Sequence, residues 1–555
     1  MKSIMSITTS ALCALSIAGA ASAQEILILA EDVPAGLNYD GPTAAIPSSQ
    51  QGMVTLLEPL VGYADGEVSD GVTLPDFNTF EGRLAESWEF DEASLTWTFK
   101  LREGVTGCGG ATFNADDVIY TFQRAKSVSG AAPIGWFLSN VASIHGFGPE
   151  VFGDDASAKE LGDSIVKIDD YTVQIKQGEP NALLLPVLTI FGLLIFDKET
   201  MEANATDSDP WSHDYVNNTN APGFGAYCLE SWAKNEQITY SSFGGYYRGA
   251  PDATRVSVRR VPQSSNRLVV LRSGQADLVT GLTPREFNSI AEVDGVTVAG
   301  ITGNENLFIH MNFDVAPFDN VNLRKAISHA IPYDQIIATG YFGQATKWEG
   351  HVPSTYPGFT ASAGFSYDPE IAKTLLAEAG YPDGAGLEAF ADAFALSYVA
   401  EKESTLGPIV NVIQTALRDV GIPATLNPIP QTQYGDRQLV KRDLPFAVND
   451  QEKPIGVDAG YAVQLFFVSP EKGGLNNMVN YRNDELDTMW SGARVEPDNA
   501  TRDATLAKIQ DMLAADVVWL PVVEYRTQWA FSDKITGLKW YPDNSIRYSD
   551  LQIDE

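Results

Sequence analysis

Basic residues are scarce in this sequence, and their scarcity limits the partners that the protein can bind. The 555 residues include 37 Lys and Arg against 72 Asp and Glu, a net charge of −35. No basic run is longer than a pair such as Arg259-Arg260. Because binding to a phosphate backbone requires clustered Lys and Arg, we expect no nucleic-acid partner.

Long apolar segments are absent beyond the N-terminus. The longest later apolar run, 182–196, has 15 residues and contains Pro186 and Gly192. A membrane-spanning helix needs about 20 apolar residues. We therefore expect this run to form a buried strand or helix.

The N-terminus itself has the pattern of a secretory signal peptide. Lys2 supplies a positive charge, 11–20 is apolar, and Ala21-Ser22-Ala23 matches an A-x-A cleavage site. Cys13 follows a bulky leucine, where a lipidation site would have a small residue. We predict that 1–23 is removed and that the protein is exported without a lipid anchor.

Cysteine is rare as well. The chain has three cysteines, and removal of the signal peptide would leave only Cys108 and Cys228. No C-x-x-C pair indicates thiol redox chemistry. An even number of cysteines in an exported chain permits one disulfide, and two unrelated thiols are the alternative.

Motifs that identify common catalytic mechanisms are also missing. The sequence has no G-x-S-x-G, no H-E-x-x-H and no G-x-x-x-x-G-K-[ST], so the hydrolase, zinc-protease and phosphate-loop mechanisms lose support. Adjacent acids such as Asp116-Asp117 are more typical of helix starts than of glycosidase carboxylates. The histidines are widely separated, at His145, His213, His310, His329 and His351. We expect no cofactor, no metal site and no enzymatic activity.

The residues that are present are typical of a mixed α/β protein. Apolar residues make up 44% of the chain and aromatic residues 10%, which suffices for a large core. Residues 95–101 alternate as a half-buried strand does. Asn114 and the Asp368-Pro369 pair have the pattern of helix starts, and Gly380 that of a helix end. Further helices are expected through 323–331 and 506–513, and further strands at 255–261 and 517–523.

Several short stretches occur in an order that is typical of one protein family. The stretches are 84–88, 97–105, 113–118, 223–227, 246–249, 272–277, 317–326, 377–382 and 520–525. Together they span most of the chain that follows the signal peptide. The sequence resembles the bacterial extracellular solute-binding proteins of family 5, the dipeptide-, oligopeptide- and nickel-binding group of ABC importers.

The resemblance implies a two-lobed periplasmic binding protein fold of the α/β class. The implied boundaries are 24–305 for lobe I with an inserted subdomain at about 67–184, 306–523 for lobe II, and 524–555 for a return to lobe I. The chain would cross between the lobes near 304–306 and 522–525. Closure about this hinge would bury a ligand in the cleft and present the closed form to a permease and its ATPase.

Polar residues near the implied cleft are the candidates for binding the ligand. They lie in the loop after the first strand, at the two crossings and in a loop of lobe II: Glu31, Asp32, Asn38, Asn304, Glu305, Asn306, Asp458, Tyr461 and Tyr525. Among these residues, Asp458 is the candidate for binding a ligand ammonium group.

The class of ligand stays open at this point. Family members that bind a peptide amino terminus resemble one another in an acidic Asp-Tyr-x-x-Pro stretch, which 449–461 does not reproduce. A peptide, an opine and an oligosaccharide are all compatible with the sequence. The expected function is that of a monomeric periplasmic receptor for a small polar solute. A secreted hydrolase, or a chemoreceptor or chaperone accessory on the same fold, is the alternative.

Overall fold

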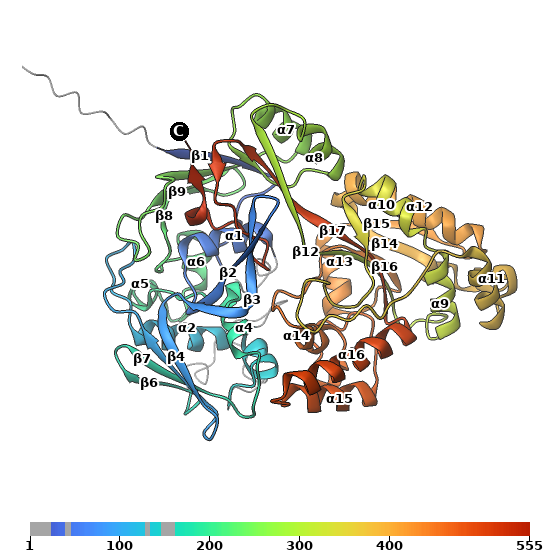
Figure 1. The fold of residues 1–555 in the computed structure, drawn as a ribbon, viewed down its shortest axis with the longest axis horizontal. Helices are drawn as coiled ribbons and strands as arrows, with labels where there is room; N and C mark the ends of the chain where they lie inside the picture. Colours follow the sequence, from blue (N-terminus) through green and yellow to red (C-terminus); the bar gives the residue numbers. More distant parts are fainter. Residues whose placement is uncertain (1–23, 39–45, 128–133, 146–160, 555) are drawn as a thin grey trace, which may run out of the picture.

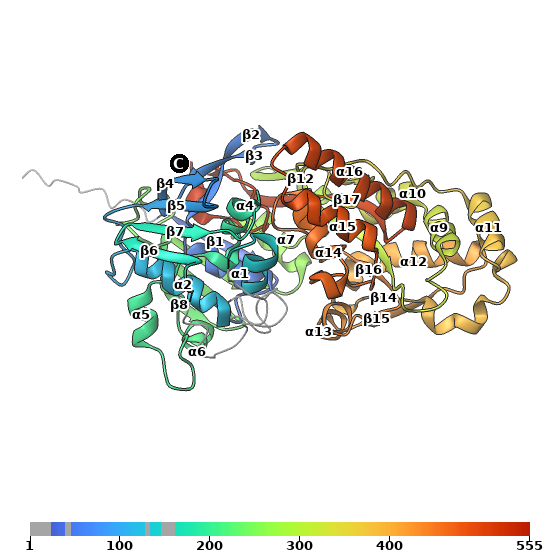
Figure 2. The same cartoon turned by 90° about the horizontal axis from the view of Figure 1, so that it is seen from below.

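The protein consists of two lobes that are joined by two long strands. The computed structural model describes residues 24–38, 46–127, 134–145 and 161–554; the predicted signal peptide, 1–23, lies outside them. Figures 1 and 2 show β12 (Val296–Met311) and β17 (Trp519–Ser532) running between the lobes. We call the body before β12, together with the C-terminal segment, lobe I, and the body between the two strands lobe II.

One mixed sheet extends through both lobes. Within the described residues it has 11 strands in the order β15-β14-β16-β12-β17-β11-β1-β10-β9-β8, and β13 pairs with β17. In lobe I the strands are β1 (Glu25–Ala30), β8 (Tyr227–Ala233), β9 (Gln237–Ser242), β10 (Arg255–Arg260) and β11 (Leu278–Val279). In lobe II they are β13 (Ala345–Lys347), β14 (Ala395–Val399), β15 (Thr425–Ile429) and β16 (Phe446–Asn449). The sheet is therefore continuous through the strands that join the lobes.

Smaller sheets belong to lobe I. A four-stranded sheet has the order β4-β5-β7-β6, and β2-β3 and β18-β19 are separate pairs. Their bounds are β2 (Val61–Ser69), β3 (Val72–Gly82), β4 (Ala85–Asp91), β5 (Thr96–Leu101), β6 (Ile165–Asp169), β7 (Thr172–Lys176), β18 (Ile535–Thr536) and β19 (Gln552–Ile553).

Helices pack on the faces of these sheets. Those before β12 are α1 (Pro47–Leu56), α2 (Ala115–Ser127), α3 (Ile134–Trp136), α4 (Leu184–Leu188), α5 (Lys198–Ala203), α6 (His213–Asn218), α7 (Ser264–Arg272) and α8 (Pro284–Ile290). Those after β12 are α9 (Val321–Ala330), α10 (Tyr333–Gly340), α11 (Pro369–Glu378), α12 (Glu403–Asp419), α13 (Gln431–Gly435), α14 (Ala459–Phe466), α15 (Asp484–Arg494) and α16 (Asn499–Asp516). Short 3-10 or π turns are η2 (Phe137–Val141), η4 (Phe191–Leu193), η5 (Pro382–Gly384), η6 (Leu387–Phe394), η7 (Ala400–Lys402), η8 (Asp436–Val440), η9 (Pro470–Lys472) and η10 (Tyr548–Asp550).

Several helix boundaries follow from local capping, as the sequence predicts. The Asp368 side chain accepts hydrogen bonds from the backbone N–H groups of Glu370 and Ile371, both at 3.1 Å. This N-cap satisfies two amides that have no partner within the helix. Asn114 accepts from the amide of Asp116 at 2.7 Å at the start of α2. The predicted helices at these two positions are confirmed.

One segment differs in extent from its sequence pattern, and another takes one of the two forms that its pattern allows. The strand expected at 517–523 begins only at Trp519, because Val517 has a left-handed backbone conformation at the end of α16, and it continues to Ser532. Its second half alternates weakly in sequence and is held by pairing with β12. The apolar run 182–196, expected to form a buried strand or helix, is buried and forms the helical turns α4 and η4. None of the helices in the described ranges combines the length and apolarity that crossing a bilayer requires.

Apolar and charged contacts connect the lobes on the side that is remote from the joining strands. One buried apolar cluster includes residues of lobe I together with residues of α14, α15 and α16. The rings of Phe137 in lobe I and Tyr461 in lobe II stack at 6.2 Å. Arg494 of α15 forms an ion pair of 2.5 Å with Glu179 and donates to the carbonyl of Asn140 at 3.3 Å. The structure therefore shows the lobes in contact.

Cys108 and Cys228 form a disulfide in lobe I. The sulfur atoms are 2.00 Å apart, and the two residues are separated by 120 positions. Cys228 lies on β8, and Cys108 lies in a turn that is closed by a hydrogen bond from the Gly110 amide to the Gly107 carbonyl at 2.9 Å. The bridge thus ties the segment before α2 to the main sheet.

Candidate functional site

The two strands that join the lobes change register where they pass between them. Pairing of β12 with β17 is regular from Val296 to Thr302 and resumes at Asn306, which lies opposite Glu524. Gly303, Asn304 and Glu305 fall within this irregularity. An irregular ladder leaves backbone and side-chain groups free to bind other segments. The side chains of Asn304 and Glu305 bind other segments in this way.

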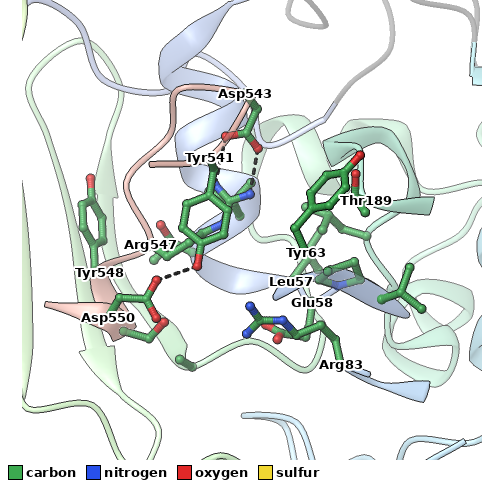
Figure 3. A pocket seen from close by; sticks show the side chains of 18 of the residues that line it. Leu57, Glu58, Tyr63, Arg83, Thr189, Tyr541, Asp543, Arg547, Tyr548 and Asp550 are labelled. Atoms are coloured by element: carbon green, nitrogen blue, oxygen red, sulfur yellow. Dashed lines mark hydrogen bonds and ion pairs between the residues drawn. The ribbon is translucent and has the colours of Figure 1, made fainter. Parts of the chain in front are cut away.

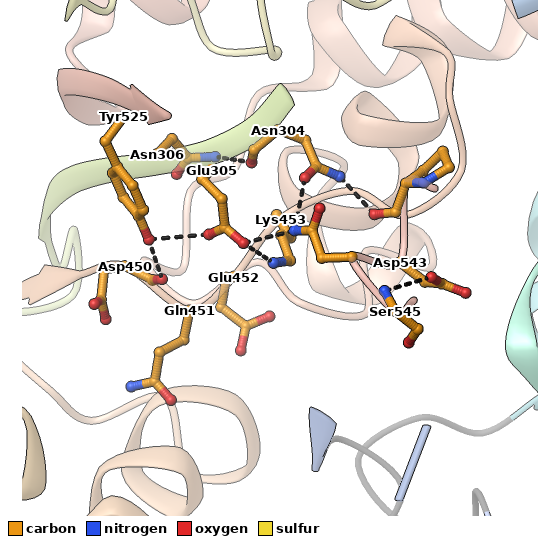
Figure 4. A network of polar contacts seen from close by, with 12 residues as sticks. Asn304, Glu305, Asn306, Asp450, Gln451, Glu452, Lys453, Tyr525, Asp543 and Ser545 are labelled. Atoms are coloured by element: carbon orange, nitrogen blue, oxygen red, sulfur yellow. Dashed lines mark hydrogen bonds and ion pairs between the residues drawn. The ribbon is translucent and has the colours of Figure 1, made fainter. Parts of the chain in front are cut away.

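Glu305 binds groups from three segments of the chain (Figure 4). Its carboxylate forms an ion pair with Lys453 and accepts hydrogen bonds from the Tyr525 hydroxyl at 2.9 Å and the Asn544 amide at 2.6 Å. Burial alone would raise the pKa of Glu305, but the charge of Lys453 and the hydrogen bonds outweigh it and lower the pKa. The carboxylate is therefore ionised and bound within the protein.

Asn304 is buried beside Glu305 and binds the C-terminal segment. Its side-chain N–H donates to the Tyr356 hydroxyl at 2.8 Å and to the Pro542 carbonyl at 2.7 Å, and its oxygen accepts from Asn544 at 3.1 Å. Asn306, the third residue predicted here, donates to the Asn304 carbonyl at 3.2 Å. The polar residues of the crossing thus position the segment that begins at Tyr541.

A pocket lies directly next to this network (Figure 3). Its walls come from α1 and the residues that follow it, from 189–194, from the start of β8 and from the C-terminal segment 541–550. Lobe II contributes Ile455. Pro542, whose carbonyl binds Asn304, also lines the pocket. The pocket is therefore built on lobe I and is closed on one side by lobe II.

Charged side chains in the wall formed by the C-terminal segment neutralise one another. Arg547 binds Asp543 through both of its terminal nitrogens, at 2.7 and 3.1 Å, and lies 4.3 Å from the centre of the Tyr541 ring. The Tyr541 hydroxyl donates to Asp550 at 2.7 Å. Figure 3 shows these groups converging on one side of the pocket. A bidentate Arg–carboxylate pair fixes both side chains, so this wall is rigid.

The opposite wall carries a carboxyl group and a hydroxyl group. Glu58 accepts hydrogen bonds from the hydroxyls of Tyr246 and Tyr247, at 3.1 and 3.2 Å, and burial raises its pKa. The hydroxyl of Tyr63 is buried and forms no hydrogen bond of normal geometry within the described residues. Arg83 lies nearby and pairs with Glu81 at 2.8 Å. The pocket therefore offers both hydrogen-bond donors and acceptors.

The lobe II loop that carries Ile455 also carries Glu452. Its carboxyl accepts from the Asn476 amide at 3.4 Å, and burial raises its pKa to about 7. In Figure 4 the side chains of Gln451 and Glu452 point away from the Glu305 carboxylate. Glu452 has no ion-pair partner within 4.0 Å among the described residues. It is a carboxyl group next to the lobe junction whose charge is not neutralised by a direct contact.

Asp458 and Tyr461, predicted to bind ligand from lobe II, have intramolecular contacts instead. Asp458 caps α14 by accepting from the Gly460 amide at 2.6 Å, and both of its oxygens bind Arg502, at 2.5 and 2.9 Å. Tyr461 is fully buried against Phe137. Neither residue lines the pocket. The Arg502 guanidinium already neutralises the carboxylate that was expected to bind an ammonium group.

The three predicted residues of the loop after β1 do not line the pocket either. Asp32 pairs with Arg260 at 2.8 Å, and Glu31 is exposed. Asn38 is buried and accepts from Arg124 at 2.9 Å. Of the predicted site residues, the structure brings together Asn304, Glu305, Asn306 and Tyr525.

Sequence reasoning missed the residues that form the pocket itself. Glu58 is the only charged residue of the mostly apolar stretch 53–61, and a single acid in such a stretch is a signal of a buried functional or structural carboxyl. Glu452 does not line the pocket, but it lies three residues before Ile455, which does. Arg547 has no local signal, because only the return of the C-terminal segment brings it to α1.

Within the described ranges, no group of three or more His, Cys, Asp or Glu could hold a metal ion.

A pocket beside strands that join two lobes defines a class of protein, the two-lobed binding proteins. In that class, a ligand held between the lobes stabilises their closed arrangement. The chain belongs to the bacterial extracellular solute-binding proteins, family 5, whose family model matches residues 79–469. The family consists of solute-binding proteins.

Individual relatives agree with this assignment over nearly the whole chain. Heme-binding protein A of Haemophilus influenzae is 26% identical over 85% of this chain and 84% of its own length. The structure of MoaA from A. tumefaciens R10 in complex with mannopinic acid matches with a TM-score of 0.77 at 23% identity, covering 96% of this chain and 100% of that one. A dipeptide-binding protein from Pseudoalteromonas sp. SM9913 in complex with Met-Leu has the same TM-score and coverage at 19% identity. The two structural matches establish the fold.

Proposed function

We propose that this protein captures a small polar solute in the pocket beside the strand crossing and delivers it to an ABC importer from the periplasm. The observation that carries the proposal is the position of the pocket. Its walls belong to lobe I, Ile455 of lobe II closes it, and the strands that join the lobes run next to it. A solute that contacts both lobes stabilises only the closed arrangement and shifts the population toward it.

The lining of the pocket supports a solute of the peptide or opine class. Aromatic rings and aliphatic side chains supply apolar area, and Glu58, Tyr63 and Arg83 supply a few polar groups at fixed positions. This composition is typical of small-molecule sites. Relatives are described in complex with a dipeptide and with an opine. The permease and ATPase partners, and the monomeric state, follow from the family resemblance.

The first test is direct binding. Protein purified without denaturation is analysed by native mass spectrometry for a bound solute, and calorimetry then measures binding of Met-Leu, mannopinic acid and heme. We expect binding without chemical change of the solute, which also separates the proposal from a secreted hydrolase. Turnover of a bound solute, or no bound solute and no binding of any of the three compounds, would contradict the proposal.

Filling the pocket from the lobe II side should remove binding. Ile455→Trp places a larger ring into the space that the solute would occupy, and we expect at least a tenfold loss of affinity. The matched control is Ile371→Trp on α11, where the isoleucine is 43% exposed and remote from the pocket. Calorimetry of both variants checks this, and an Ile455→Trp affinity equal to that of the control would place the solute elsewhere.

For a cationic solute, we propose that Glu452 binds the ammonium group in place of Asp458: it does not line the pocket itself, but it lies in the same lobe II loop as Ile455, and unlike Asp458 it has no ion-pair partner within 4.0 Å among the described residues. Its pKa of about 7 means that the group becomes neutral as the pH falls through 7. If only the carboxylate binds the cation, affinity should fall roughly 30-fold between pH 8 and pH 5.5. Glu452→Gln should remove this pH dependence, whereas the matched control Glu401→Gln, at an exposed site, should keep it. Parallel pH profiles for Glu452→Gln and the wild type would show that Glu452 does not bind the cation.

A further inference from the structure

We propose that Glu305 is a positioning residue that holds the lobe II side of the solute pocket, at Ile455, and its C-terminal wall, 541–550, to the strand crossing, without itself contacting the solute. The inference rests on the proposed function, because it assigns a role within that site. It differs from the expectation that Glu305 binds the ligand, and it is carried by the contacts of the carboxylate.

The location of Glu305 is the first step of the argument. The residue lies where the β12–β17 ladder loses its register, so its side chain leaves the sheet at the point where the chain passes between the lobes. The side chain is only 17% exposed. A carboxylate at such a position must be stabilised by charges and hydrogen bonds from the protein.

The three partners of Glu305 come from three different parts of the molecule. Tyr525 lies on β17, the other strand that joins the lobes. Lys453 lies in the lobe II loop, two residues before Ile455, which lines the pocket. Asn544 follows Asp543, which lines the pocket from the C-terminal segment. One carboxylate thus binds the crossing strand and a neighbour of each of these two parts of the pocket; Figure 4 shows its contacts with Tyr525 and Lys453.

The energetics favour a holding role over contact with solute. The charge of Lys453 and the hydrogen bonds from Lys453 and Tyr525 lower the pKa of Glu305 in spite of burial, so its charge is compensated within the protein. Removing one member of such a buried pair leaves the other unpaired. The Lys453 side chain, which is 23% exposed, would then turn toward solvent, and the loop that carries it would become more mobile. The pocket wall at Ile455 would lose its position relative to the wall at Asp543.

The experiment compares four variants with the wild type. Glu305→Gln keeps an acceptor for Tyr525 but loses the charge that binds Lys453. Lys453→Met removes the ion pair from the other side, Lys453→Arg restores the charge, and the double variant Glu305→Gln/Lys453→Met completes a mutant cycle. The matched control is Asp443→Asn, which breaks an ion pair of 2.8 Å with Arg437 that lies entirely within lobe II.

Hydrogen exchange of the unliganded proteins is the main readout, because it needs no identified solute. In Glu305→Gln and in Lys453→Met we expect amides of both 450–457 and 541–550 to exchange at least tenfold faster than in the wild type. The double variant should exchange no faster than either single variant. Lys453→Arg and Asp443→Asn should stay within twofold of the wild type at both segments.

The outcomes separate a positioning role from a merely structural one. Exchange that accelerates throughout both lobes, together with a lower melting temperature, would indicate general destabilisation and overturn the proposal. Acceleration at only one segment, or at neither, would also overturn it.

Binding of Met-Leu, measured by calorimetry, is the second readout. Where the wild type binds Met-Leu, Glu305→Gln should bind it at least tenfold more weakly. Failure of the wild type to bind any solute contradicts the proposed function, whereas wild-type exchange in Glu305→Gln contradicts this inference alone.

Discussion

Replacing His310 and His351 by leucine should make the protein more resistant to acid. Both side chains are fully buried in lobe II, and desolvation lowers the pKa of each to about 3, against 6.5 in the unfolded chain. Below pH 6.5 the unfolded state therefore binds protons that the folded state does not, so stability is lost as the pH falls toward 3. At pH 4.5 the cost is about 2.7 kcal/mol for each histidine and roughly 5 kcal/mol for the pair.

The surroundings of the two rings explain why neither is protonated in the folded protein. His310 lies on β12 opposite Trp519 and Ala447, and both of its ring nitrogens are buried without a hydrogen-bond partner among the described residues. The His351 ring lies parallel to the Trp519 ring, and its Nε2 is 3.3 Å from the Trp519 carbonyl. Leucine removes three ring nitrogens that have no partner, both of His310 and Nδ1 of His351, at the loss of the single contact between His351 Nε2 and the Trp519 carbonyl, so we expect at most a small loss of stability at pH 7.5.

The effect is measured as a difference between variant and wild type, because other buried groups act in the opposite direction. Glu452 and Asp117 have pKa values raised to about 7 and about 6, mainly by burial, and protonation of these groups stabilises the folded state as the pH falls. Denaturant unfolding measures the free energy of unfolding of the wild type and of the double variant at pH 7.5 and at pH 4.5. His145→Gln, at an exposed histidine, is the control and should follow the wild type. Equal pH dependence in the double variant and the wild type would show that the two histidines are protonated in the folded protein.

Removing the disulfide between Cys108 and Cys228 should lower the stability of lobe I by about 2 to 5 kcal/mol. The bridge joins residues 120 positions apart, so it restricts a long loop in the unfolded chain. The restriction is entropic and is lost whether the bridge is reduced or both cysteines are replaced by serine. Hydrogen exchange and thermal unfolding of Cys108→Ser/Cys228→Ser measure the loss.

Reduction supplies the control for this second prediction. Dithiothreitol should bring the wild type to the melting temperature of the double serine variant and should leave the variant itself unchanged. Counting thiols in denatured, unreduced protein that lacks the signal peptide should find none. Two free thiols, or a variant as stable as the oxidised wild type, would contradict the prediction.

The site could be predicted from the sequence only in part. Asn304, Glu305 and Tyr525 were expected at the strand crossing, and the structure brings them together there. Their partners were not predictable, because Lys453 and Asn544 lie 148 and 239 positions from Glu305 in the chain. The contact of Asp458 with Arg502 was not predictable for the same reason, because Arg502 lies 44 positions away on α16. No pattern near Asp458 distinguishes a carboxylate that binds a solute from one that binds an arginine.

The sequence by itself determined the family, the α/β class and the helices whose ends are set locally. Asp368 caps α11 through amides two and three residues away, so the start of this helix can be predicted from neighbouring residues in the sequence. Only the tertiary structure decided where the pocket lies and which charges remain unpaired. The pairing of β12 with β17 and the return of 541–550 to lobe I bring distant residues together. Such contacts depend on the path of the whole chain, because their energy comes from burial and charge pairing between segments with no local relation.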